Sequence, residues 1–172
     1  MSTEPGEIVN RVDRMGVETI DLELYFPEGE RVVYDIKNDL WQGLALKEKD
    51  FREHIKTNNW EVYKDQHVAI VCGADAIVPT WAYMLLATAL KAHASTVVFG
   101  DLETLENQLF MQSLTKLKLE DYRDKRVVIK GCGERAISDS VFVELTLRLE
   151  GLAKAIMYGE PCSTVPVYRK PR

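Results

Sequence analysis

The chain has 172 residues, of which 46% are apolar and 28% charged, so it is long enough to bury a sizeable core, and one domain is the default expectation. Acidic residues outnumber basic ones by 27 to 22, and the basic residues form no long run, which disfavours nucleic acid and anionic membranes as partners. No apolar run approaches the length of a membrane span, and the polar, acidic N-terminus lacks the features of a signal peptide. We therefore expect a cytoplasmic protein.

The first part of the chain, residues 1–66, mixes strand and helix signals. The segment Thr19–Leu24 alternates apolar and acidic residues, as a half-buried strand does, and Arg31–Ile36 has the composition of a second strand. Turn residues at 27–30 separate the two, which favours an antiparallel pair. A helix is expected to follow from residue 47 to about residue 58. The sequence thus predicts a small N-terminal antiparallel element with a helix.

The second part, residues 67–172, alternates strands with helices, and it contains no low-complexity segment and no repeat of the solenoid kind. The expected strands are His67–Cys72, Ser95–Phe99, Arg126–Lys130 and Ala153–Tyr158, and the expected helices lie around residues 80–90, 102–114 and 138–149. Such alternation predicts right-handed βαβ units and a mainly parallel four-stranded sheet with crossover helices. We therefore expect one α/β domain over residues 1–172, with 1–66 packed as an extension on a βαβαβαβ core at 67–172.

Three cysteines come at or just beyond the ends of predicted strands: Cys72, Cys132 and Cys162. If those strands are parallel neighbours, all three thiols lie at the carboxyl edge of the sheet, where open α/β sheets build their binding sites. A structural disulfide is not expected in the reducing cytoplasm. The cysteine positions therefore predict a functional site at that edge.

A transition-metal site is the leading interpretation of these thiols. Soft thiolate sulfur selects zinc or iron over magnesium or calcium. The fourth ligand would be a water, a cluster sulfide or one of three carboxylates that are near a cysteine in the sequence, namely Asp75, Glu134 and Glu160. Among the histidines, His67 and His93 are expected at the opposite edge of the sheet, and the sequence does not place His54.

Several alternatives stay open. A cysteine at a strand end is often a small buried hydrophobe, and the chain has no C-x-x-C pair. Loop N–H groups could instead activate Cys132 or Cys162 as a nucleophile or redox thiol. A small-molecule-binding enzyme could use the same edge, with Asp75 and Cys132 near the substrate. Finally, the very apolar helix at 81–90 could form a homodimer contact in a protein without chemistry of its own.

Four segments resemble a known family: Phe26–Arg31, Cys72–Leu85, Val127–Cys132 and Tyr158–Pro166. Together they are similar to the bacterial family called domain of unknown function 2480, and the similarity runs from about Ile8 to the C-terminus. The family has no established activity to carry over. The resemblance implies an association with gene neighbourhoods for iron–sulfur cluster assembly, and hence an accessory role with assembly proteins as partners.

Overall fold

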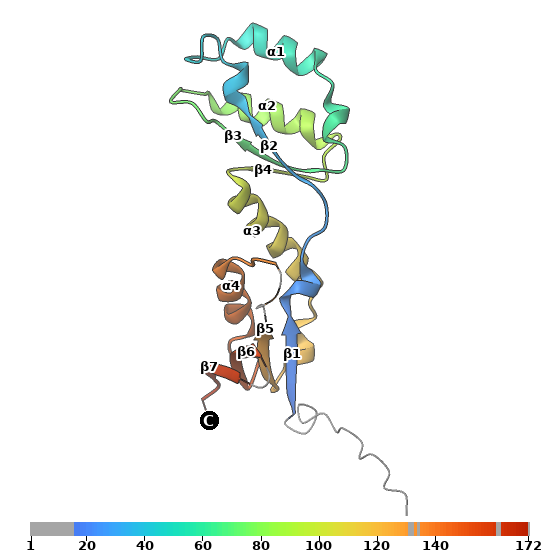
Figure 1. Ribbon diagram of the computed structural model, residues 1–172, viewed down its shortest axis with the longest axis vertical. Coiled ribbons are helices and arrows are strands. Elements are labelled where there is room, and N and C mark those ends of the chain that lie inside the picture. Colours follow the sequence, from blue (N-terminus) through green and yellow to red (C-terminus); the bar gives the residue numbers. More distant parts are fainter. Residues whose placement is uncertain (1–15, 131–132, 134, 161–162, 172) are drawn as a thin grey trace, which may run out of the picture. The chain divides into compact units, whose positions relative to one another are not determined.

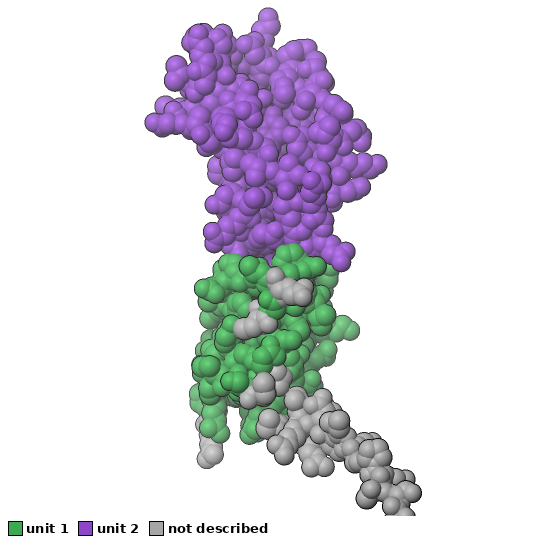
Figure 2. Space-filling model, in the orientation of Figure 1, with its two compact units in different colours: residues 1–26, 111–172 green, residues 27–110 purple. Residues whose placement is uncertain are grey.

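The computed structural model describes residues 16–130, 133, 135–160 and 163–171. The chain divides into two compact units, distinguished by colour in Figure 2. Unit 1 consists of residues 1–26 and 111–172, and unit 2 of residues 27–110. Among the described residues, no helix has the length and apolar character needed to cross a membrane. That residues 1–172 form one domain, with 1–66 packed on 67–172, stays a prediction.

Unit 2 consists of a parallel sheet with helices on both faces (Figure 1). Its strands are β2 (Arg31–Asp35), β3 (His67–Val71) and β4 (Thr96–Phe99), in that order across the sheet. Two helices, α1 (Glu48–Thr57) and α2 (Thr80–Lys91), cover one face. The helix α3 (Leu102–Ser113) packs Leu105 and Leu109 against Ala69 on the other face. Because β3 is covered on both faces, it is apolar at every central position, as parallel strands usually are.

Unit 1 contains a mixed sheet of four strands in the order β1-β5-β6-β7. The strands are β1 (Val17–Asp21), β5 (Arg126–Lys130), β6 (Ala155–Glu160) and β7 (Ser163–Arg169). The first three are parallel, and β7 is antiparallel to β6. One helix, α4 (Asp139–Leu149), begins after the N-cap Ser138 and buries three apolar side chains, Val141, Leu145 and Leu149.

The structure corrects the predicted sheet. The α/β class and the four helices are confirmed, but the strands form two sheets instead of one. The two N-terminal strands do not pair with each other: β1 pairs parallel with β5, and β2 pairs parallel with β3. The turn residues at 27–30 indicate only a local change of direction. The buried apolar strands β3 and β5 each need a hydrogen-bonded neighbour along both edges, and β2 and β1 supply one such neighbour each. The antiparallel pair is C-terminal and consists of β6 and β7.

The two units repeat one pattern, which is the main finding that the sequence inspection missed. Positions in 48–101 correspond without a gap to positions in 107–160. Each residue is equivalent to the one 59 positions later, as Val68 is to Val127. The buried side chains of α2 and α4 match pair by pair: Ala82 with Val141, Leu86 with Leu145 and Leu90 with Leu149. The first strands match as well, because Asp35 aligns with Val71 and Asp21 aligns with Lys130 in their sheets.

Backbone hydrogen bonds confirm that the correspondence is structural. The N–H of Asp65 donates to the carbonyl of His93 at 3.2 Å, and the N–H of Asp124 donates to the carbonyl of Leu152 at 2.9 Å. Both aspartates have positive φ, 60° and 57°, which is uncommon outside glycine and is tolerated best by Asp and Asn. The tight turn that leads into each central strand is therefore the same in both units.

Truncation of the matched leucines tests this repeated core. Leu86 and Leu145 have no exposed surface, so replacing either with alanine should lower the free energy of unfolding by about 2–5 kcal/mol, since a buried cavity is left. Leu147→Ala, on α4 but 60% exposed, is the control and should cost less than about 0.5 kcal/mol. Urea denaturation measures all three. A cost for either buried leucine as small as that of the control would contradict the assigned core.

Candidate functional site

Each sheet has its own carboxyl edge, so the predicted site residues are divided between two edges. Cys72 and Asp75 follow β3 in unit 2, and Glu160 ends β6 in unit 1. Cys132, Cys162 and Glu134 lie outside the described residues, so the convergence of the three thiols stays a prediction. Among the described residues, no group of three or more His, Cys, Asp and Glu side chains is arranged to hold a metal ion.

At the edge of unit 1, one ammonium lies among carboxylates. Lys130 ends β5 and is the register partner of Asp21 on β1. Its Nζ lies 3.4 Å from Asp21 Oδ2 and 3.9 Å from Glu160 Oε1. Hydrogen bonding to Asp21 and the charges of Asp21, Glu160 and Glu23 raise the pKa of Lys130 above 10.5. Three carboxylates therefore lie around this one ammonium.

A carboxylate also anchors the loop that follows β5. The 3-10 helix η2 (Leu22–Tyr25) is capped by Asp21, whose Oδ1 accepts the N–H of Glu23 at 3.0 Å. Glu23 in turn accepts the backbone N–H of Arg135 at 3.2 Å. A Cβ at position 133 would overlap the carboxylate of Glu23, so a larger residue there would displace that side chain. The η2 turn thus holds the loop close to the end of β1.

In unit 2, a carboxylate likewise anchors the loop that follows the central strand β3. Asp35 accepts the N–H of Gly73 at 2.9 Å and that of Lys37 at 3.0 Å, and it pairs with Lys37 Nζ at 3.0 Å. Desolvation by burial raises the pKa of Asp35, but the two N–H donors and the lysine outweigh it and hold the pKa below 3.8. A Cβ on Gly73 would come within 2.6 Å of the Asp35 carboxylate.

The described cysteine, Cys72, is partly buried beside Tyr83. Its thiol lies 3.5 Å from the carbonyl oxygen of Ala74, to which it donates. Burial is the main cause that raises the pKa of the Tyr83 hydroxyl, and the neighbouring Cys72 is the next. The Tyr83 ring packs edge-on against Phe99 at 4.8 Å between centroids. Cys72 therefore has partners within unit 2, and Asp75 lies exposed in the same loop.

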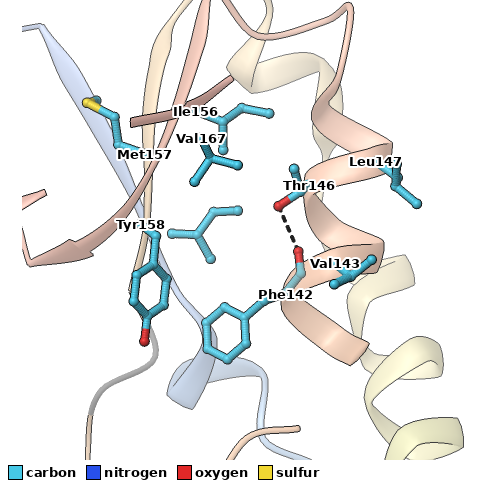
Figure 3. Close-up of a pocket in the computed structure, with 9 residues that line it drawn as sticks. Phe142, Val143, Thr146, Leu147, Ile156, Met157, Tyr158 and Val167 are labelled. Carbon is cyan, nitrogen blue, oxygen red and sulfur yellow. Dashed lines mark hydrogen bonds between the residues drawn. The ribbon is translucent and has the colours of Figure 1, made fainter. Parts of the chain in front are cut away.

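Sequence reasoning did not find the apolar pocket of unit 1 (Figure 3). It encloses about 310 Å³ between α4 and strands β5 to β7. Its polar lining residue Thr146 donates its hydroxyl to the carbonyl of Phe142 at 2.8 Å, so the wall is almost entirely apolar. The rings of Phe142 and Tyr158 meet edge to face at 5.5 Å. Two exposed apolar residues that line the pocket, Val143 on α4 and Val167 on β7, are the signal from which the pocket could have been suspected.

The histidines are where the sequence expected them, and His54 can now be placed. His67 begins β3 and His93 follows α2, so both lie away from the carboxyl edge. His54 on α1 lies 3.1 Å from the hydroxyl of Tyr34, which donates to Asp39 at 2.7 Å. Burial, and then Asp39, raises the pKa of Tyr34. The three side chains form a partly buried polar cluster at the edge of the core of unit 2.

The comparisons with known proteins agree with the resemblance noted in the sequence. The family model described as protein of unknown function (DUF2480) matches residues 6–170, nearly the whole chain. The chain belongs to the DUF2480 family. No curated protein and no solved structure matches it. The site of this DUF2480 protein must therefore be argued from its own residues.

The raised pKa of Lys130 gives a direct test of the unit 1 edge. In this DUF2480 chain the Lys130 ammonium should titrate above 10.5, because the folded state favours its charged form. The stabilisation is present at lower pH and is lost as the pH rises through the raised pKa. NMR titration of the lysine side chains measures this. Asp21→Asn should move the midpoint down, whereas Glu144→Gln, which affects the Arg148 pair, should not. An unchanged midpoint in Asp21→Asn would refute the arrangement.

Proposed function

We propose that this protein binds a transition metal, zinc or iron, at the carboxyl edge of the unit 1 sheet, with Cys132 and Cys162 as thiolate ligands. The observation that carries the proposal is that β5 and β6 are neighbouring parallel strands. Each cysteine follows the end of its strand by two positions, Cys132 after Lys130 and Cys162 after Glu160. Cys72 follows a strand of the other sheet and is left out of this ligand set.

The charges of the described residues support a cation at this edge. Asp21, Glu23 and Glu160 lie around one lysine, and carboxylates of this kind favour a bound cation. Glu160 is the described carboxylate for a further ligand position, and Glu134 is its counterpart in the loop sequence after β5. The ammonium of Lys130 would stabilise thiolate charge and so lower the pKa of neighbouring thiols. Thiolates near carboxylates suit zinc and iron.

The proposed role is that of an accessory protein in iron–sulfur cluster metabolism, with cluster-assembly proteins as partners. Two thiolates and a carboxylate leave a ligand position for water, for a cluster sulfide or for a partner's side chain. An open position of this kind is typical of metal sites that exchange or react rather than sites that only brace a fold. The family resemblance supports the iron–sulfur context.

Metal analysis tests this proposal. Untagged protein purified anaerobically should hold about one zinc or iron per chain, and Cys132→Ser or Cys162→Ser should remove it, since each takes away a thiolate. Cys72→Ser is the matched control and should keep the metal, because Cys72 belongs to the other sheet. Circular dichroism checks that the variants fold.

Two results would contradict the metal site. One is wild-type protein without metal although its thiols are reduced. The other is loss of metal in Cys72→Ser while Cys162→Ser retains it. Metal-free protein in which a thiol reagent modifies Cys132 much faster than Cys72 would favour the nucleophilic or redox interpretation instead.

The apolar pocket favours a second candidate function, binding of a small uncharged molecule. Its volume of about 310 Å³ is at the lower end of the range for ligand sites, and its wall is formed by apolar side chains. A flat ring or a short alkyl chain fits such a wall, whereas a charged group would lose its hydration without gaining a partner. This function would belong to a small-molecule-binding enzyme or carrier.

An uncharged fluorescent probe tests the pocket. N-phenyl-1-naphthylamine should bind with enhanced fluorescence, and Val143→Glu should weaken binding at least about tenfold, because it puts a charge at the opening. Val62→Glu is the control: both valines are 59% exposed, but Val62 lies in unit 2. Equal binding by the two variants, or none by the wild type, would rule the pocket out.

A further inference from the structure

The internal repeat exposes a difference at one sheet edge. In unit 1 the outer edge of β6 pairs with β7, from Ala155 with Arg169 to Glu160 with Ser163. The equivalent strand of unit 2 is β4, where Thr96 corresponds to Ala155. After β4 the chain forms the helix α3 instead of returning as a strand. No strand among the described residues pairs with the outer edge of β4.

The backbone groups on this outer edge can be identified. Gly100, directly after β4, donates its N–H to the carbonyl of Ile70 on β3 at 3.0 Å. Because alternate residues of a strand point to the same side, Val98 also faces β3, and Val97 and Phe99 face outward. Their counterparts in unit 1, Ile156 and Tyr158, lie on the edge that β7 covers. Both units therefore offer the same hydrogen-bonding edge.

Nothing in the sequence of β4 protects this edge. Terminal strands usually carry charges, proline or a bulge that prevent pairing with another chain. The other terminal strands have such features: β1 has Glu18, β2 has Arg31, and β7 has Pro166 with an irregular register beside it. By contrast, β4 reads Thr-Val-Val-Phe, has no charge, and leaves Phe99 66% exposed.

We propose that β4 pairs antiparallel with β4 of a second copy of this chain, joining two unit 2 sheets across a twofold axis. In a pairing centred on Val98, the outward backbone N–H and C=O groups of Val97 in one copy lie opposite those of Phe99 in the other. This pairing also sets Phe99 of one copy beside Val97 of the other, an aromatic and β-branched pair of the kind that stabilises sheets. Because the strand is uncharged, self-pairing brings no like charges together.

The test combines oligomeric state with hydrogen exchange on the full chain. Light scattering after gel filtration should give a dimer for the wild type. Phe99→Lys, which adds a charge to the edge, and Phe99→Pro, which removes an outward N–H, should each give a monomer. Val165→Lys is the control, since Val165 is 62% exposed on β7, and it should stay dimeric. The amides of Val97 and Phe99 should exchange more slowly as the protein concentration rises, while that of Val98, which faces β3, should not change.

Each other outcome overturns the proposal. A wild-type monomer at micromolar concentration would mean that another partner, or none, covers β4. A dimer that persists in Phe99→Lys would place the contact elsewhere. If Phe99→Pro fails to fold, Phe99→Lys and the wild-type exchange rates decide alone, and amide exchange at Val97 that is independent of concentration counts against the pairing. The metal site is not needed for this dimer, so either proposal can fail without the other.

Discussion

Burial of the two central strands is the constraint on which the rest of the structure depends. Val68 to Ile70 in β3 and Val127 to Ile129 in β5 have almost no exposed surface. A strand that is apolar on both faces needs a covering layer on each face and a hydrogen-bonded neighbour along each edge. In unit 2, α1 and α2 form the layer on one face, and α3 forms the layer on the other. The neighbouring strands are β2 and β4, as β1 and β6 are for β5. Each N-terminal strand thus pairs with a strand later in the chain, and the two do not pair with each other.

The repeat separates what both units share from what is particular to each. Both anchor the loop after the central strand with a carboxylate packed on a glycine, Asp35 on Gly73 and Glu23 on Gly133, although these residues are not equivalent positions of the repeat. The features that differ are the candidates for function. At the end of the central strand, Val71 in unit 2 corresponds to Lys130 in unit 1, which brings an ion pair to that edge. At the outer edge, β7 closes unit 1, whereas β4 of unit 2 stays open within the described residues.

The local pattern of the sequence predicted the elements well but not their assembly. Apolar spacing located all four helices, and the structure places the N-cap of α4 at Ser138. Strand order could not be predicted in this way, because pairing of β1 with β5 depends on residues more than a hundred positions apart. The repeat was missed because few of its positions are identical; what recurs is burial, as in Ala82 and Val141. For the candidate site, the carboxyl edge and Glu160 as a ligand stay predictions from the sequence. The ion pair of Lys130 with Asp21 could not be predicted, because Asp21 reaches Lys130 only through that distant pairing.

Cross-strand nuclear Overhauser effects between backbone protons most directly test the central claim, which is that both sheets contain the same arrangement of three parallel strands. The account predicts contacts between Thr19 and Val128 in one sheet and between Val33 and Ala69 in the other, both with parallel patterns. Contacts between the two N-terminal strands in an antiparallel pattern, with neither central strand showing those partners, would contradict it.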